Sequence, residues 1–249
     1  MKHFFRFFVT NPLMQKKLGT LRMCVLLALC VTLVGLAGPR VLYTAAPALP
    51  LSGLRVTLDP GHGGYDGGAR AHDSGIWEKK LTLEIALAIE KELKAQGAQV
   101  FLTRRDDVCL AEGDTATKAR KRADLQKRLD IAQATKSDVF LSIHLNEYRD
   151  RSESGPQVFF QRGGKEGEAL SLALQEALIA ELKPQKERRA MAGDYYVLRG
   201  PLPSALVECG FLSHPGEEKL LMDAAYQQRI GKALANGLAA WLAHSSPAL

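Results

Sequence analysis

The chain has 249 residues, of which 46% are apolar, so it can bury one sizeable core, and a single domain behind a short N-terminal segment is expected. It holds 33 Lys and Arg against 27 Asp and Glu, but six of the basic residues and none of the acidic ones lie within residues 1–40. The rest of the chain therefore has 27 basic and 27 acidic residues, and this balance argues against nucleic acid as a partner.

The N-terminus combines positive charge with an apolar run. Residues 23–37 carry no charge and have the length of a signal-peptide core or a short membrane span. We expect a basic cytoplasmic N-terminus over residues 1–22, a signal or transmembrane anchor over 23–40, and a Pro/Ala-rich linker over 41–53. The folded domain, residues 54–244, is then exported and held extracytoplasmically by its anchor. No clean small-x-small site follows the run, so an uncleaved anchor is favoured, and cleavage remains open.

Helix and strand patterns alternate from residue 54 onward. The helix expected over residues 78–96 carries Leu81, Ile85, Ile89 and Leu93 on one face, four residues apart. Further helices are expected at residues 118–135, 166–182 and 225–243, and strands at 55–58, 99–103, 138–144, 157–161, 195–198 and 205–208. This alternation predicts a single α/β domain with a twisted, mostly parallel sheet that is covered by helices on both faces.

Ionisable residues stand at the predicted strand ends, which is where α/β sheets bind their ligands. His62 follows the first strand in the glycine-rich run DPGHGGYDGG, His144 ends the third strand, and Glu208 ends the last. Glu78 begins the first helix of the domain, at the end that faces the strand mouths. Two imidazoles and a carboxylate form a typical zinc-hydrolase ligand set, and a further carboxylate can carry the proton of the attacking water.

Each of these residues also has a simpler interpretation. His62 could be a turn residue, Glu78 a first-turn acid, and His144 a hydrogen-bonded core histidine. Glu208 could pair with an arginine, since a buried carboxylate needs a partner. These separate interpretations do not explain why all four residues fall at one edge of the sheet, so a zinc site is favoured. Weaker candidates are His72, His214 and Glu84.

Four motifs in this order resemble those of the zinc-dependent N-acetylmuramoyl-L-alanine amidases of type 3, and they span residues 54–242. They are DPGHGGYDGGA, EKKLTLEIA, SIHLN and PSALVECGFLSHP. The resemblance implies that a Zn²⁺ cofactor is bound by His62, Glu78 and His144, and that Glu208 is the catalytic glutamate. It also implies that Asn146 lies near the site, and that the substrate is the amide between N-acetylmuramic acid and L-alanine of peptidoglycan.

Within this family, the chain resembles the short membrane-anchored amidases of sporulation and germination. SIHLN is followed by SGPQVFF at residues 154–160, there is one N-terminal anchor, and no wall-binding repeats are found. This resemblance implies a role in forming muramic-δ-lactam in spore cortex and suggests an activating lipoprotein partner. Cys209 and His214 depart from the family pattern, but neither is a motif ligand. With Cys109, Cys209 makes too few cysteines for a disulfide framework.

Three alternatives remain open. The chain could be a general cell-wall amidase of growth or division, although residues 183–194 are too short and polar for the inhibitory helix of the division enzymes. It could be a zinc carboxypeptidase on a related fold, for which no arginine clamp can be placed in the sequence. It could also be a metal-free wall-binding module with a decayed site, although all four site residues are present.

Overall fold

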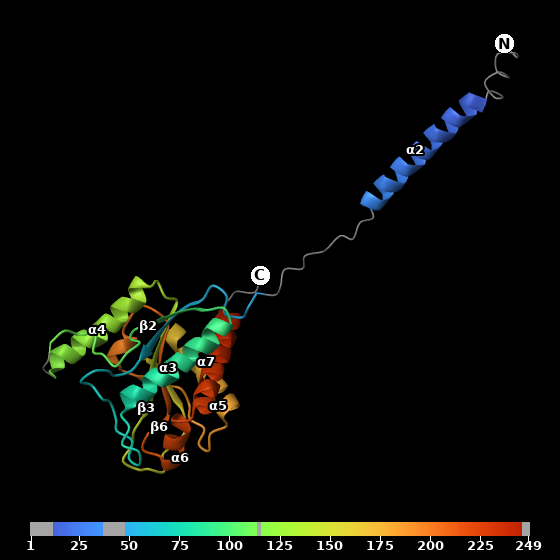
Figure 1. Ribbon diagram of the computed structural model, residues 1–249. Coiled ribbons are helices and arrows are strands. Elements are labelled where there is room, and N and C mark those ends of the chain that lie inside the picture. Colours follow the sequence, from blue (N-terminus) through green and yellow to red (C-terminus); the bar gives the residue numbers. More distant parts are fainter. Residues whose placement is uncertain (1–11, 37–47, 114–115, 246–249) are drawn as a thin grey trace. The chain divides into compact units, whose positions relative to one another are not determined.

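The computed structural model describes residues 12–36, 48–113 and 116–245, and the chain divides into two units, Met1–Pro47 and Ala48–Leu249 (Figure 1). The first unit contains helix α2 (Pro12–Leu36). Its exposed large apolar side chains include Leu21, Met23, Val25, Leu26, Leu27 and Leu29. Among the described residues, no helix is long and apolar enough to cross a membrane. Residues 1–11 of the predicted cytoplasmic N-terminus and residues 37–47 lie outside the described part.

A six-stranded sheet forms the centre of the second unit, in the order β2-β1-β3-β6-β4-β5. The strands are β1 (Arg55–Pro60), β2 (Gln99–Leu102), β3 (Val139–Asn146), β4 (Gln157–Gln161), β5 (Met191–Gly193) and β6 (Ser204–Phe211). Only the β4–β6 pair is antiparallel. The prediction of a single α/β domain with a mostly parallel sheet is confirmed, and the carboxyl ends of β1, β3 and β6 are neighbours.

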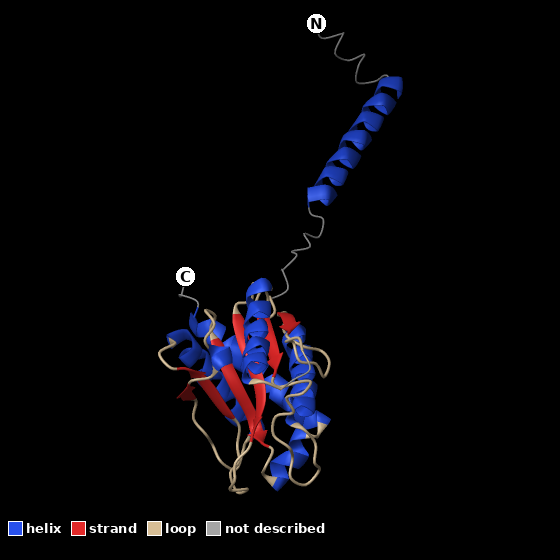
Figure 2. Ribbon diagram, turned by 90° about the vertical axis from the view of Figure 1, so that its left-hand side faces the viewer, coloured by secondary structure: helices blue, strands red, loops and turns tan. Residues whose placement is uncertain are grey.

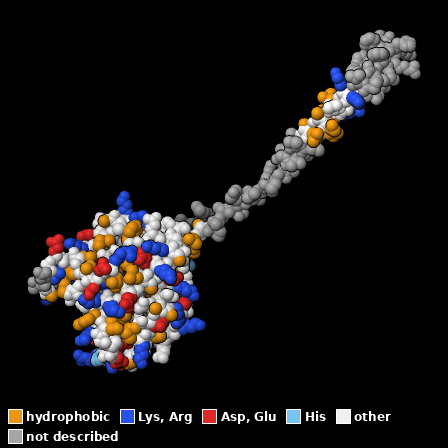
Figure 3. Space-filling model, in the orientation of Figure 1, with side chains coloured by type: hydrophobic (Ala, Val, Ile, Leu, Met, Phe, Trp, Pro, Cys, Tyr) orange, Lys and Arg blue, Asp and Glu red, His pale blue; other side chains and the backbone are white. Residues whose placement is uncertain are grey.

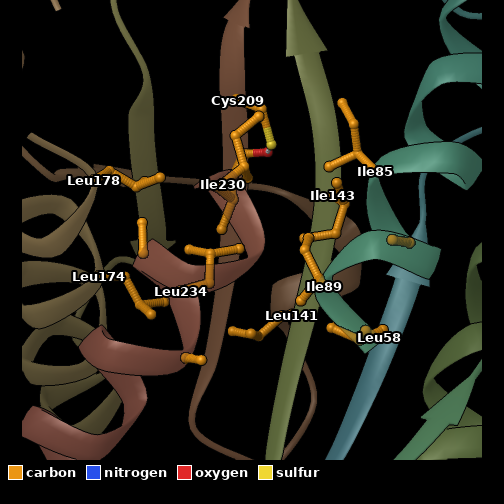
Figure 4. Close-up of a cluster of buried hydrophobic side chains, with 14 of the residues drawn as sticks. Leu58, Ile85, Ile89, Leu141, Ile143, Leu174, Leu178, Cys209, Ile230 and Leu234 are labelled. Atoms are coloured by element: carbon orange, nitrogen blue, oxygen red, sulfur yellow. Dashed lines mark hydrogen bonds between the residues drawn. The ribbon is translucent and has the colours of Figure 1, made fainter. Parts of the chain in front are cut away.

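The main core lies between one face of the sheet and three helices, α3 (Glu78–Ala95), α5 (Lys165–Leu182) and α7 (Ala224–Ser245). Alternate strand residues such as Leu141 and Ile143 meet Ile85 and Ile89 of α3, while Ile230 and Leu234 come from α7 (Figure 4). The predicted apolar stripe of α3 is buried, which confirms its periodicity, and Leu170, Leu174 and Leu178 of α5 are buried too. Helix α7 packs against both α3 and α5.

The opposite face of the sheet has less cover. It is packed by α4 (Lys118–Ala134) and by the 3-10 turn η1 (Tyr196–Leu198), so helices lie on both sides of the strands (Figure 2). A small apolar cluster forms here from Ala132, Phe140, Val197, Leu198 and Leu206. Leu125 and Leu129 of α4 are only partly buried, and the fully inward positions of this helix belong instead to Asp124, Arg128 and Ala132.

Three local features differ from the expected pattern or add to it. The strand expected at residues 195–198 is wrong, because Tyr196–Leu198 form η1; so short an apolar run is compatible with either conformation. Helix α6 (Pro215–Leu221) was not expected. His214 caps its N-terminus, and Pro215 occupies the first helical position, where proline is a recognisable start signal. Leu51, within the predicted linker, is fully buried, and its amide donates to the Gln96 carbonyl.

Surface charge agrees with the balance in the sequence. On the face of the second unit shown in Figure 3, basic, acidic and apolar side chains are interspersed, without a continuous basic surface. This is the distribution expected from 27 basic and 27 acidic residues after residue 40.

Candidate active site

The loop after β1 is shaped by glycines that make room for three side chains. His62 itself has a left-handed backbone with φ of 63°. A β-carbon at Gly61 would overlap the His144 ring. A β-carbon at Gly68, where φ is +69°, would lie 2.5 Å from Glu78 Oε2. The glycine-rich motif therefore lets the backbone pass directly beside the ionisable groups.

His62, Glu78 and His144 come together at the carboxyl edge of the sheet. Glu78 lies between the two imidazoles, with Oε2 3.1 Å from His62 Nε2 and Oε1 3.1 Å from His144 Nδ1. The ring centroids of the two histidines are 4.8 Å apart. One potential ligand atom from each residue lies within 4.8 Å of the others, so these three residues can bind one metal ion.

Hydrogen bonds hold Glu78 in its ionised form. Burial alone would raise the pKa of Glu78, but hydrogen bonds and charges from His144 and His62 outweigh it and hold this pKa far below its usual range. The amides of Ala69 and Leu145 also donate to the carboxylate, at 2.8 and 3.0 Å. The side chain is therefore fixed as an anion between two imidazole nitrogens, which is the charge state that metal binding would need.

His62 holds a proton strongly in this arrangement. Burial would lower its pKa, but the carboxylates of Asp66 and Glu78 outweigh burial and raise the pKa to about 9. Asp66 Oδ1 lies 3.0 Å from His62 Nδ1, on the ring edge opposite Glu78. A carboxylate on the second nitrogen is the usual support of a metal-binding histidine.

Glu208 lies beside the cluster but does not share its hydrogen bonds. It is paired in register with His144 across β3 and β6. Its Oε2 is buried and has no hydrogen-bond partner among the described residues. Burial, and then the charge of Glu78, raise the pKa of Glu208 to about 8. An unpartnered buried carboxylate oxygen beside a His–Glu–His set fits a divalent cation such as zinc with a bound water.

Two buried arginines support the loop that carries His62, and neither was predicted. Arg128, 2% exposed, donates through Nη1 to the Pro60 carbonyl and to Asp59 Oδ1, and through Nη2 to the His62 carbonyl. Arg104, 3% exposed, donates to the carbonyls of Pro60 and Gly61 at 3.0 and 2.8 Å. Together the two guanidinium groups bind three successive backbone carbonyls.

The sequence indicates one contact of Arg128, its pair with Asp124. Asp124 and Arg128 are one helical turn apart on α4, their side chains pair at 2.8 Å, and both are buried. Asp59 completes this buried network, with Thr103 and Ser142 donating to its two oxygens at 2.7 Å. The spacing of Asp124 and Arg128 indicates an ion pair within one helix, and the structure adds its burial and its contact with Asp59.

The weaker candidates lie apart from the cluster. His72 is exposed, His214 caps α6, and Glu84 pairs with Lys80 at 2.8 Å. Asn146 ends β3, two residues beyond His144. The cysteines of the second unit, Cys109 and Cys209, are both free thiols.

The fold and the site together define an α/β domain with a candidate metallohydrolase centre at its strand ends. Residues 56–240 match the family model of N-acetylmuramoyl-L-alanine amidase, type 3. The chain belongs to this family, which confirms the resemblance seen in its motifs, and it is accordingly an N-acetylmuramoyl-L-alanine amidase of the hydrolase class.

The relatives include a germination-specific amidase and amidases of known structure. The chain is 36% identical over 193 residues to the germination-specific N-acetylmuramoyl-L-alanine amidase of Bacillus subtilis, covering 77% of this chain and 81% of the relative. Its fold matches the CwlD amidase of Clostridioides difficile, solved in complex with the GerS lipoprotein, with a TM-score of 0.73 and 34% identity over 77% of this chain and 100% of that one. The catalytic domain of CwlV from Bacillus (Paenibacillus) polymyxa matches with a TM-score of 0.65 and 29% identity, over 76% of this chain and 98% of that one.

Proposed function

We propose that this chain is a zinc-dependent amidase that hydrolyses the amide between N-acetylmuramic acid and L-alanine in peptidoglycan. The observation that carries the proposal is the His62–Glu78–His144 cluster with the unpartnered oxygen of Glu208 beside it. His62, Glu78 and His144 would hold the Zn²⁺ ion. Zinc bound there supplies Lewis-acid chemistry, because it lowers the pKa of water and polarises an amide carbonyl.

Glu208 is assigned the proton transfers. A carboxylate next to a cation has a lowered pKa, so Glu208 would then be ionised and able to accept the proton of the attacking water. It would deliver the same proton to the departing alanine nitrogen, which must leave as a neutral amine. Burial of its Oε2 shields that oxygen from bulk solvent, and its position beside His144 on the neighbouring strand keeps the carboxyl close to the ligand cluster.

The proposed biological setting is the formation of muramic-δ-lactam in spore cortex. Similarity to a germination-specific amidase and to CwlD supports it. Export and membrane tethering through residues 23–40 are part of the proposal, with the domain at residues 54–244 outside the cytoplasm, supported by the exposed apolar side chains of α2. The GerS complex of CwlD supports an activating lipoprotein as a partner.

The test uses the purified full-length chain, zinc and defined muropeptides, with mass spectrometry of the product ends. We expect an intact peptide with a free alanine amine and a sugar with a free lactyl carboxylate. Shortened peptides that remain attached to the sugar would identify a carboxypeptidase instead. Restoration of muramic-δ-lactam in a spore former that lacks its own amidase would separate the cortex role from a general wall role.

A further inference from the structure

Tyr195 lies on the sheet face that carries Glu208 and its cross-strand neighbour His144. Side chains two residues apart on a strand share a face, so Leu206 of β6 is on the same face as Glu208. Leu206 is paired in register with Phe159 of β4, and the Tyr195 ring packs on Phe159 with 5.3 Å between the ring centroids. This packing brings Tyr195 to the neighbourhood of Glu208.

A hollow of about 180 Å³ lies between Tyr195 and the two histidines of the cluster. Tyr195, His62 and His144 all line it, and so does Asp66, which supports His62. Tyr195 is only partly buried, so its side chain is accessible from this hollow. An amide that reaches the two histidines therefore enters the same hollow that Tyr195 lines.

The Tyr195 ring is fixed, but its hydroxyl is free to donate. A β-carbon at Gly193 would overlap the ring, so the ring lies directly on this backbone as well as on Phe159. Within the part of the chain that the structure describes, no hydrogen-bond partner is found for the Tyr195 hydroxyl. The neighbouring Tyr196 differs, because its hydroxyl donates to Gln126 Oε1 at 2.7 Å. Tyr195 thus presents a preorganised donor whose hydrogen bond is not already used.

The Tyr195 hydroxyl keeps its proton. Burial raises the pKa of Tyr195 above the ordinary value for tyrosine, and the negative charge of Glu208 raises this pKa further. The hydroxyl therefore lies within electrostatic range of the Glu208 carboxylate. A phenol that keeps its proton can donate a hydrogen bond but cannot take the proton of the attacking water, so it does not duplicate Glu208.

The requirements of amide hydrolysis leave one role for such a donor. The reaction needs an acceptor for the proton of water, a donor for the departing nitrogen, and a group that stabilises the carbonyl oxygen as it gains negative charge. Glu208 serves the first two in the proposed mechanism. A neutral donor near Glu208 suits the third, where it would add to the polarisation that a bound cation supplies.

We infer that Tyr195 is a further catalytic residue, whose hydroxyl donates a hydrogen bond to the carbonyl oxygen of the scissile amide. This inference rests on the proposed amidase function. Attack of water on the carbonyl carbon opens the C=O double bond and moves an electron pair onto this oxygen, while Glu208 receives the proton of the water. The phenolic proton stays on Tyr195, and its hydrogen bond strengthens as the oxygen gains charge. A contact that strengthens in this way lowers the barrier more than it strengthens substrate binding.

The experiment compares the full-length, zinc-loaded protein with Tyr195→Phe, which removes only the hydroxyl. Tyr196→Phe is the matched control, because the two tyrosines are adjacent and the Tyr196 hydroxyl is engaged in an exposed hydrogen bond with Gln126. Thermal melting and atomic absorption show whether each variant is folded and holds zinc. Steady-state kinetics on N-acetylmuramoyl-L-alanyl peptides give kcat and KM. Titration calorimetry measures the Kd of the product peptide and of a phosphinate analogue, in which a tetrahedral phosphorus oxygen stands for the charged carbonyl oxygen.

We expect kcat of Tyr195→Phe to fall about a hundredfold with little change in KM. The Kd of the phosphinate should rise by a similar factor, while the product peptide binds as before and Tyr196→Phe matches the unaltered chain throughout. Full kcat in Tyr195→Phe, a loss confined to KM, a loss of zinc, or an equal loss of affinity for analogue and product would overturn the inference while the amidase function stands. Failure of the unaltered chain to cleave any N-acetylmuramoyl peptide would refute the proposed function, and the inference with it.

Discussion

Nη2 of Arg128 lies 2.7 Å from the carbonyl oxygen of His62, so a side chain of α4 binds the backbone of the residue that begins the candidate metal cluster. His62 has a left-handed φ of 63°, a conformation that is costly for a residue with a β-carbon. The hydrogen bond from Arg128 offsets this cost and holds the backbone from which the imidazole projects. The buried ionic network is thus a support of the site as well as of the fold.

Arg128→Ala should therefore destabilise the protein and weaken zinc binding together. Removing one partner of a buried ion pair leaves Asp59 without its counter-charge, which costs about 3–5 kcal/mol of unfolding free energy. Denaturant unfolding measures the stability, and titration calorimetry of the full-length chain measures the zinc affinity. Arg149→Ala, at an exposed arginine, is the control and should change neither. An Arg128 variant that binds zinc normally would contradict the positioning role.

Asp59 should make stability depend on pH in the acid range. Burial would raise the pKa of Asp59, but the charge of Arg128 and hydrogen bonds from Thr103 and Ser142 outweigh it and hold the folded pKa below 3.8. A carboxyl with a depressed folded pKa stabilises the protein above its unfolded pKa, and this contribution is lost as the pH falls through the folded pKa. Urea unfolding between about pH 3 and pH 7 should show this loss. In Asp59→Asn the acid slope should be shallower; an unchanged slope would assign it to other carboxyls.

Glu208→Gln should separate turnover from metal binding. The amide is nearly isosteric but cannot accept the proton of the attacking water, so kcat should fall about 10²- to 10⁴-fold. The zinc content, measured by atomic absorption, should remain at one ion per chain, as the assignment of Glu208 outside the ligand set requires. Glu78→Gln is the informative contrast, because it should lose both zinc and activity. Normal peptide release by Glu208→Gln would show that another group carries the proton.

Gly68→Ala should disturb the His62–Glu78–His144 cluster by steric overlap, in addition to straining the backbone. Its β-carbon would lie 2.5 Å from Glu78 Oε2 and 2.7 Å from His62 Cδ2. Gly163→Ala is the control, since Gly163 also has a positive φ, of +83°, but has no atoms within 4 Å of an added β-carbon. Both variants should lose roughly 1–2 kcal/mol of stability from left-handed strain. Only Gly68→Ala should show zinc affinity reduced at least about tenfold; equal affinities would count against the cluster.

The sequence predicted those features that depend on local periodicity. The buried face of α3 is formed by Leu81, Ile85 and Ile89, as expected. A four-residue spacing of apolar residues places them on one face of a helix. Placing His62 and His144 at strand ends was enough to bring them together, since parallel strands end at one edge. Their role as ligands, and the catalytic role of Glu208, remain predictions.

Long-range ionic contacts could not be predicted in the same way. Nothing within the neighbourhood of Arg104 in the sequence indicates that it binds the carbonyl of Gly61, because such a contact depends on how two loops meet in space. The 3-10 turn at Tyr196 could not be predicted for a similar reason, because a short apolar run takes its conformation from the residues that it packs against.

Side chains along β6 alternate between the two faces of the sheet, and this alternation sets the orientation of Glu208. Val207 and Cys209 point into the main core, and Glu208, between them, points to the opposite face. A shift of this strand by one residue would exchange its core-facing and site-facing side chains. It would bury the Glu208 carboxylate in the apolar core and place the Cys209 thiol beside the histidines. The free energy gained by packing the whole apolar core opposes such a register shift. Packing of the apolar core therefore fixes the orientation of the Glu208 carboxyl group. Local unfolding that leaves the core packed should leave the geometry of the site unchanged.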